Sequence, residues 1–178
     1  NVGPVVFRQL LARYGSPAAA LEALPELARR AGGKKRVQLC PPEKAEAEAE
    51  AARKAGVKLL ALCEPGYPEL LRAIDDAPPV LAVIGDPTLL ALPAVGMVGA
   101  RNASGNGRRF AERLARELAE AGLMIASGFA RGIDTAAHRG ALPRPTVAAM
   151  AGGVDVVYPP ENEALHAEIA EQGALISE

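Results

Sequence analysis

Short apolar runs alternate with segments of helical periodicity along the second half of the chain. The pattern predicts strands at 95–99, 123–126, 146–150 and 174–176, and helices at 108–121, 134–141 and 162–172. In the helix at 108–121, the spacing predicts that Phe110, Leu114 and Leu118 are buried. Repeated βα units of this length are typical of an α/β protein with a doubly wound, mainly parallel sheet covered by helices on both faces.

The first half of the chain has a different pattern. Residues 1–33 have helical spacing interrupted at Gly15–Pro17, which predicts a small helical (SAM-like) unit. A polar linker containing Lys34, Lys35 and Arg36 leads to a predicted helix at 43–55 and to strands at 57–62 and 80–84. We therefore predict an N-terminal helical domain and linker at 1–40, and an α/β domain at 41–178.

Composition and charge narrow the class of protein. No stretch of the chain approaches the roughly 20 apolar residues of a membrane span, so we expect a cytoplasmic protein without a membrane partner. Cys40 and Cys63 lack metal-site spacing and are expected to be reduced. Because the chain starts at Asn1 and stops just after a predicted strand, we expect it to be part of a longer protein.

The chain has no net positive charge, but its arginines are concentrated in one segment. The net charge of −1 argues against coating nucleic acid by bulk charge. Between residues 99 and 144, however, eight arginines face four acids: Arg101, Arg108, Arg109, Arg113, Arg116, Arg131, Arg139 and Arg144 against Glu112, Glu117, Glu120 and Asp134.

Three consecutive predicted strands end in glycine-rich turns, at Gly99–Gly107, Ser127–Asp134 and Ala151–Asp155. The carboxyl ends of parallel strands meet at one edge of a sheet, where ligands of open α/β folds bind. Glycine allows close approach to the backbone, and turn N–H groups and helix N-termini favour phosphate. The three turns together therefore predict a site for a ligand that contains phosphate.

Motifs of the common phosphate-handling and hydrolytic enzymes are absent. The chain has no G-x-x-x-x-G-K-[ST] motif, and Gly105-Asn106-Gly107 lacks the third glycine of the dinucleotide fingerprint. Ser127 lies in Ile125-Ala126-Ser127-Gly128-Phe129, which lacks both glycines of the G-x-S-x-G nucleophile elbow. We predict no metal site, no cofactor and no catalytic residue.

Two arginines differ from the others because they lie inside the turns. A guanidinium beside backbone donors suits phosphate or a stacked base, which favours Arg101 and Arg131 as ligand-binding residues. Phe129 is equally compatible with base stacking and with burial against the sheet. Asp134 and His138 are read as an N-cap and an orienting or packing residue, with an acid–base pair or metal ligands as the less favoured alternative.

Three longer motifs resemble the DNA-processing protein A (DprA, or Smf) family in order and spacing. They are Val98-Gly99-Ala100-Arg101-Asn102-Ala103-Ser104, Ser127-Gly128-Phe129-Ala130-Arg131-Gly132-Ile133-Asp134, and Gly153-Val154-Asp155-Val156-Val157-Tyr158-Pro159-Pro160-Glu161-Asn162. The resemblance extends upstream through Tyr67–Leu71 and Pro78–Asp86 and into the helical start.

The resemblance implies an extended Rossmann-like core that binds single-stranded DNA, dimerises and helps to load the RecA recombinase during natural transformation, without enzymatic activity. The implied DNA- or phosphate-binding residues are Gly99, Arg101, Asn102, Ser127, Gly128, Arg131, Gly132, Gly152 and Gly153, with Asp134, His138 and Asp155 as structural or orienting residues.

Two rival functions share this kind of sheet. Phosphoribohydrolase-like enzymes resemble P-G-G-x-G-T-x-x-E, but the third turn here has no matching glutamate. A sensor that binds a free nucleotide remains open, because a pocket for an oligonucleotide phosphate also fits a mononucleotide.

Overall fold

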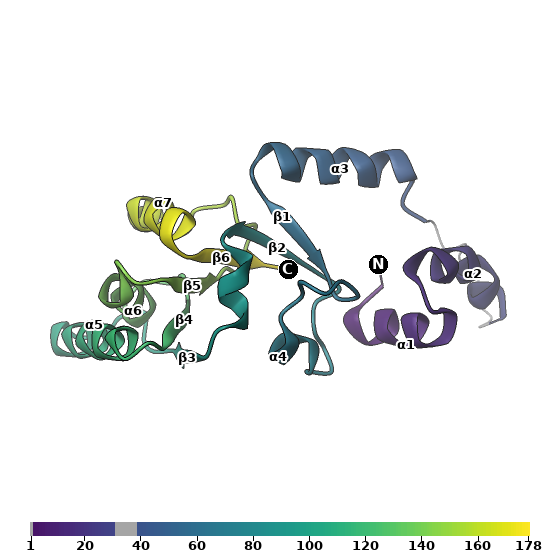
Figure 1. Ribbon diagram of the computed structural model, residues 1–178. Helices are drawn as coiled ribbons and strands as arrows, with labels where there is room; N and C mark the ends of the chain where they lie inside the picture. Colours follow the sequence, from purple (N-terminus) through teal and green to yellow (C-terminus); the bar gives the residue numbers. More distant parts are fainter. Residues whose placement is uncertain (1, 31–38) are drawn as a thin grey trace.

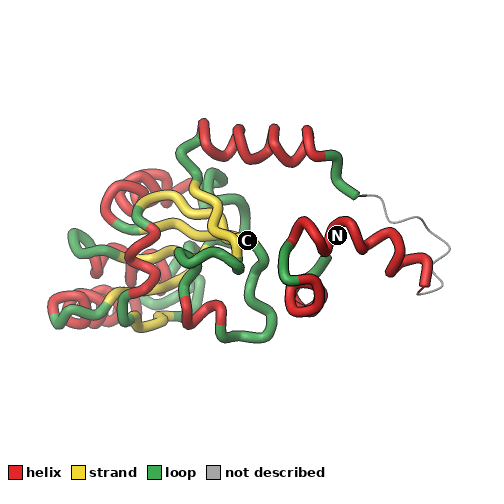
Figure 2. Tube along the Cα trace, turned by 45° about the vertical axis from the view of Figure 1, so that its right-hand side comes forward, coloured by secondary structure: helices red, strands yellow, loops and turns green. Residues whose placement is uncertain are grey.

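The computed structural model describes residues 2–30 and 39–178 (Figures 1 and 2). The predicted linker residues Lys34, Lys35 and Arg36 lie outside these ranges. None of the described helices combines the length and apolar character needed to cross a membrane. In chain order the elements are α1 (Pro4–Tyr14), α2 (Pro17–Arg30), α3 (Pro42–Lys54), β1 (Lys58–Ala61), α4 (Glu69–Arg72), β2 (Val80–Gly85), η1 (Pro87–Ala91), β3 (Ala94–Met97), α5 (Gly105–Glu120), β4 (Met124–Gly128), α6 (Ile133–Ala141), β5 (Thr146–Ala149), η2 (Pro160–Asn162), α7 (Glu163–Gln172) and β6 (Ala174–Ser177).

The N-terminal helices α1 and α2 form a hairpin set apart from the sheet (Figure 1). Helix α1 ends at Gly15, whose left-handed φ of 77° lets its N–H donate to the carbonyl of Leu11 at 2.8 Å. This confirms the break predicted at Gly15. The hairpin contacts the α/β core where Phe7 packs against the cluster that contains Tyr67, and where Arg8 donates to the carbonyl of Arg72.

The sheet has six strands in the order β1-β2-β6-β5-β4-β3. Strands β3, β4, β5 and β6 run parallel to one another, whereas β2 pairs antiparallel with both β6 and β1. The mainly parallel α/β sheet predicted from the sequence is therefore confirmed, with an antiparallel pair extending it beyond β6.

The two faces of the sheet are covered differently. Helices α5, α6 and α7 all lie on one face, where alanines of α5 and α6 pack on Ile125, and Leu165 and Ile169 of α7 pack on Leu175. The opposite face, which includes Met124 and Val147, packs against the segment around α4 and η1. The three long helices thus lie together on one side and only short segments cover the other, so the prediction of helices on both faces does not hold for the long helices.

Helix α5 does not bury the face that carries its large apolar side chains, although the sequence pattern predicted that it would. Phe110, predicted to be buried, is 56% exposed, and Leu114 and Leu118 are only half-buried. The buried positions are Ala111, Ala115 and Ala119, spaced by four along the helix. Small side chains on this face let α6 approach closely, and the aromatic ring is left outside beside the guanidinium of Arg113, at 5.8 Å.

Candidate functional site

The three glycine-rich turns meet at the carboxyl edge of the parallel strands, as the sequence predicted. They enclose a cavity of about 440 Å³, which we call the carboxyl-edge cleft. Residues from the ends of β3, β4 and β5 line it, together with the segment before η2. The lining residues are Arg101, Asn102, Gly128, Phe129, Ala130, Arg131, Asp134, Ala149, Met150, Ala151, Gly152, Val156, Tyr158 and Pro159.

The first two turns are in direct backbone contact. Gly132 has a φ of 86°, and a Cβ built on it would lie 2.2 Å from the carbonyl oxygen of Ala100 and 2.5 Å from that of Arg101. Only glycine allows this approach. The N–H of Ile133 donates to the Ala100 carbonyl at 3.3 Å. The two turns therefore present Arg101 and Arg131 at a fixed separation.

The second turn is also held by side chains that follow it. The Asp134 carboxylate accepts from the N–H of Ala130 at 3.3 Å, and the Thr135 hydroxyl donates to the Ala130 carbonyl at 2.8 Å. The buried Asn162 amide donates to the Phe129 carbonyl at 3.2 Å and to Thr135 Oγ1 at 3.0 Å. Both sides of the Ala130 peptide are thus fixed immediately before Arg131.

The prediction that Asp134 is the N-cap of its helix is wrong. Helix α6 begins at Ile133, Gly132 is its N-cap, and Asp134 lies inside the first turn. Its carboxylate reaches back to Ala130 because the positive φ of Gly132 turns the preceding peptides toward it. Asp134 therefore organises the turn, and its negative charge also suits the helix N-terminus.

His138 is fully buried and connects α6 to two strands. Its Nε2 lies 2.7 Å from the carbonyl oxygen of Gly128, which can only accept, so Nε2 carries the proton. Nδ1 lies 2.9 Å from Thr146 Oγ1, whose single proton can be donated either to Nδ1 or to the Ile125 carbonyl at 2.7 Å, and in the neutral tautomer Nδ1 accepts it. Burial lowers the pKa of His138 below 6.5, against smaller opposing effects of the Gly128 hydrogen bond and the Asp134 charge. A neutral, packing imidazole matches the orienting role predicted for it.

Several predicted residues support the cleft without lining it. Ser127 is buried and donates its hydroxyl to the Met97 carbonyl at 2.6 Å, which joins β4 to β3. Gly99 lies against Ile133, whose Cγ1 would be 2.5 Å from an added Cβ. Gly153 and Asp155 belong to a turn closed by the Val156 N–H, which donates to the Gly153 carbonyl at 2.9 Å. Of the third-turn residues predicted, only Gly152 reaches the cleft wall.

Phe129 was predicted either to stack on a base or to be buried against the sheet, and the structure confirms burial. Its side chain is 5% exposed and packs with Met150 and Leu165, and its ring meets that of His166 edge-on at 5.9 Å between centroids. The aromatic side chain exposed at the cleft is Tyr158, which is 72% accessible.

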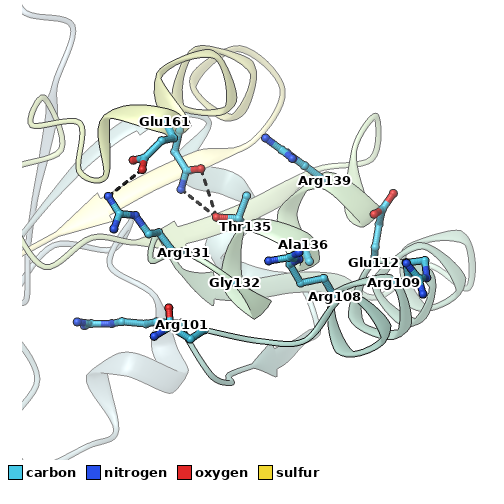
Figure 3. A pocket seen from close by; sticks show the side chains of 13 residues that line it. Arg101, Arg108, Arg109, Glu112, Arg131, Gly132, Thr135, Ala136, Arg139 and Glu161 are labelled. Carbon is cyan, nitrogen blue, oxygen red and sulfur yellow. Dashed lines mark hydrogen bonds and ion pairs between the residues drawn. The ribbon is translucent and has the colours of Figure 1, made fainter.

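A second cavity, which we call the α5–α6 groove, adjoins the cleft and has a volume of about 620 Å³ (Figure 3). The two cavities share Arg101, Asn102 and Arg131. The groove is lined by Arg101, Asn102, Gly105, Arg108, Arg109, Glu112, Arg131, Gly132, Thr135, Ala136, Arg139, Glu161 and Asn162. Five arginines thus face two glutamates, so the region is positively charged.

One of these arginines is engaged by an acid from a distant part of the chain. Arg131 pairs with Glu161 at 2.8 Å, and both side chains are more than half exposed. Figure 3 shows this pair at one end of the groove and Arg109 with Glu112 at the other. In the part of the chain that the structure describes, the guanidinium groups of Arg101, Arg108 and Arg139 form no ion pair with a carboxylate.

Reasoning from the sequence did not single out Thr135, Asn162, Glu161 and Tyr158 as site residues. The last three lie in the third quoted motif, which places them just after the third turn. Only their position within that motif could have identified them as site residues, because no chemical pattern distinguishes them. Within residues 2–30 and 39–178, no three His, Cys, Asp or Glu side chains are grouped to hold a metal ion.

Fold and site together define an α/β protein with an arginine-rich cleft at the carboxyl edge of its parallel strands. Residues 58–178 match the family model described as DNA recombination-mediator protein A, and residues 1–51 match that of the DprA-like N-terminal HHH domain. The chain therefore belongs to the DNA recombination-mediator protein A family.

Similar proteins include the DNA processing protein DprA of Bacillus subtilis, 35% identical over 131 residues that cover 72% of this chain and 44% of the relative. Protein Smf of Synechocystis is 37% identical over 121 residues, which cover 65% of this chain and 30% of the relative. The chain thus spans less than half the length of these curated relatives.

Two solved structures share the fold. The X-ray structure of DNA processing protein A from Streptococcus pneumoniae superposes with a TM-score of 0.65 at 27% identity, covering 99% of this chain and 68% of that chain. A structure of DNA processing protein A from Helicobacter pylori, described for its single-stranded DNA binding mode, gives a TM-score of 0.60 at 33% identity, covering 68% of this chain and 54% of that chain.

Proposed function

We propose that this chain binds single-stranded DNA at the carboxyl-edge cleft and serves, as a cytoplasmic homodimer, in a recombination mediator that helps to load RecA during natural transformation. In this proposal the chain catalyses no reaction and needs no cofactor. The observation that carries it is the pair Arg101 and Arg131, fixed by the Gly132 contact at the mouth of a cleft of about 440 Å³.

Phosphate is the ligand group that this arrangement suits best. Guanidinium groups form strong charge-assisted hydrogen bonds with phosphate oxygens, and glycine-rich turns let a backbone approach closely. A cleft of this size holds one nucleotide unit. The exposed ring of Tyr158 offers a stacking surface for a base at the same cleft.

Single strands fit better than duplex DNA because a cavity of about 440 Å³ suits one nucleotide unit and the exposed Tyr158 ring needs an unpaired base face. The similarity to the Helicobacter pylori protein, described for its single-stranded DNA binding mode, also supports this choice. Membership of a recombination-mediator family supports the mediator role. A free-nucleotide sensor is the second candidate, since the same cleft accommodates a mononucleotide.

Fluorescence anisotropy with labelled single-stranded and duplex DNA across a salt series tests the proposal. We expect preferential single-strand binding that weakens with salt. In the Arg101→Ala, Arg131→Ala double variant, the slope of log affinity against log salt should decrease by about 1.4, because about 0.7 is lost for each phosphate contact. Arg29→Ala with Arg30→Ala removes the same charge from α2 and should leave the slope unchanged.

Competition distinguishes the two candidates. Unlabelled mononucleotide in large excess should displace the oligonucleotide poorly if DNA is the ligand. Tight mononucleotide binding without any affinity for single-stranded DNA would contradict the proposal and favour the sensor.

A further inference from the structure

The α5–α6 groove owes its arginines to the close packing of two helices. A Cβ on Gly140 of α6 would lie 2.1 Å from the carbonyl oxygen of Glu112 in α5, so only glycine allows the two backbones to touch there. Arg139 immediately precedes that contact in α6, and Arg108 lies one turn before Glu112 in α5. Figure 3 shows Arg108 and Arg139 between the Arg131–Glu161 pair and Arg109. Arginines from two helices are therefore brought into one groove.

The charges of this groove are poorly balanced by the protein itself. Arg108 and Arg139 are exposed and, among the described residues, form no ion pair with a carboxylate. Glu112, the groove acid that belongs to α5, pairs at 3.2 Å with Arg116, an arginine that does not line the groove. The first turn of α5 contains no acid, and its N-terminal partial charge also favours an anion. An anion in the groove would relieve this mutual repulsion.

The lining also limits what kind of anion the groove can take. None of its lining residues is aromatic, so it offers no platform for a stacked base. The Thr135 hydroxyl is already donated to the Ala130 carbonyl, which leaves guanidinium groups as the principal donors. A phosphodiester backbone, which presents a regular series of singly charged groups, matches such a surface.

We propose that the α5–α6 groove is a second phosphate-binding site, in which Arg108 and Arg139 hold backbone phosphates of the strand that leaves the carboxyl-edge cleft past Arg131. The inference rests on the proposed function, because the strand must first occupy the cleft. Continuity between the two sites follows from the three lining residues that they share, Arg101, Asn102 and Arg131. The cleft would contact a base, whereas the groove would contact only the backbone and show no base preference.

Oligonucleotides of two lengths separate the groove from the cleft. We would measure anisotropy of labelled oligothymidylates of about 4 and about 12 nucleotides, within the range of common single-strand site sizes. In the Arg108→Gln, Arg139→Gln variant, the salt slope for the longer strand should fall by about 1.4, which is about sevenfold less loss of affinity between about 50 and 200 mM salt. Binding of the shorter strand should not change. The Arg113→Gln, Arg144→Gln variant loses the same charge at exposed positions outside the groove and should bind both lengths like the unmodified chain.

Each other outcome has a distinct meaning. Unchanged binding of the longer strand by the Arg108→Gln, Arg139→Gln variant would overturn the groove inference and leave the proposed function intact. Equal weakening for both lengths, or an equal effect of the control variant, would overturn it as well, because the loss would then reflect general charge. Failure of the unmodified chain to bind either length would overturn the proposed function and the groove inference with it. Thermal unfolding of each variant verifies that the fold is retained.

Discussion

Arg131 has a backbone that is fixed by hydrogen bonds, whereas its side chain forms only an exposed ion pair. The peptide before it is held by Asp134 and Thr135, and the residue after it is locked against the first turn. Its guanidinium meets Glu161 in an exposed ion pair, and such pairs contribute only about 0–1 kcal/mol. In the proposed function a phosphate would replace the carboxylate at little cost, and Glu161 would compete with the ligand for Arg131.

Removing that competitor should strengthen binding. We expect Glu161→Gln to raise the affinity for single-stranded DNA about two- to fivefold at low salt, because Arg131 is released and one negative charge leaves the site. The gain should vanish near 1 M salt, where charges are screened. Anisotropy titrations measure it. Glu163→Gln, an exposed substitution in the first turn of α7, is the matched control, and equal or weaker binding by Glu161→Gln would count against this competition.

At the scale of elements, small residues decide where the helices lie. Ala111, Ala115 and Ala119 of α5 face Ala136 and Ala137 of α6, and Gly140 touches the α5 backbone. Close approach of these backbones is what gathers arginines from both helices at the α5–α6 groove. The position of α6 relative to α5 is therefore a determinant of both stability and the site.

Adding one methyl group at Gly140 tests this. Gly140→Ala should lower the free energy of unfolding by roughly 1–3 kcal/mol, because overpacking outweighs the roughly 1 kcal/mol that alanine gains over glycine within a helix. Urea unfolding monitored by circular dichroism measures the change. Gly96→Ala is the control, since a Cβ there meets nothing within 4 Å, and it should change stability by less than about 0.5 kcal/mol. A Gly140→Ala variant as stable as the unmodified chain would show that α5 and α6 adjust freely.

The order of elements was predictable because apolar runs and glycine stops recur with a regular period, and each of the strands β3 to β6 appears where an apolar run predicted it. Burial on α5 was not predictable, since periodicity alone favours the large Phe110 over the alanines that pack. The position of β2 beside β6 depends on pairing across about 90 residues, which leaves no local pattern. The Arg131–Glu161 pair is hidden for the same reason.

At the scale of the whole molecule, a buried polar network ties the helical layer to the sheet. His138 connects α6 to β4 through Gly128 and to β5 through Thr146. The network includes the carbonyl of Gly128, which begins the turn that carries Arg131. Protonation of His138 would therefore change the free energy of unfolding of the α/β core.

This network should make stability depend on pH in a defined direction. Burial lowers the pKa of His138 in the folded chain below its ordinary value of 6.5, so the unfolded chain takes up a proton first as the pH falls. The free energy of unfolding should be constant above about pH 7 and decrease below 6.5, by at most about 1.4 kcal/mol per pH unit from this group. Urea unfolding between about pH 5.5 and 7.5 measures it. The less stable His138→Gln variant should show a shallower decrease, and identical slopes would refute this source of the pH dependence.

The contact of Gly132 with the first turn has a consequence for the thermodynamics of recognition. Loops that become ordered on binding lose conformational entropy, and that loss reduces affinity. Here the two arginine-bearing turns are joined backbone to backbone before any ligand arrives, so little ordering of the main chain is required. In the proposed function, the free energy of the phosphate contacts made by Arg101 and Arg131 is therefore little reduced by ordering of the main chain.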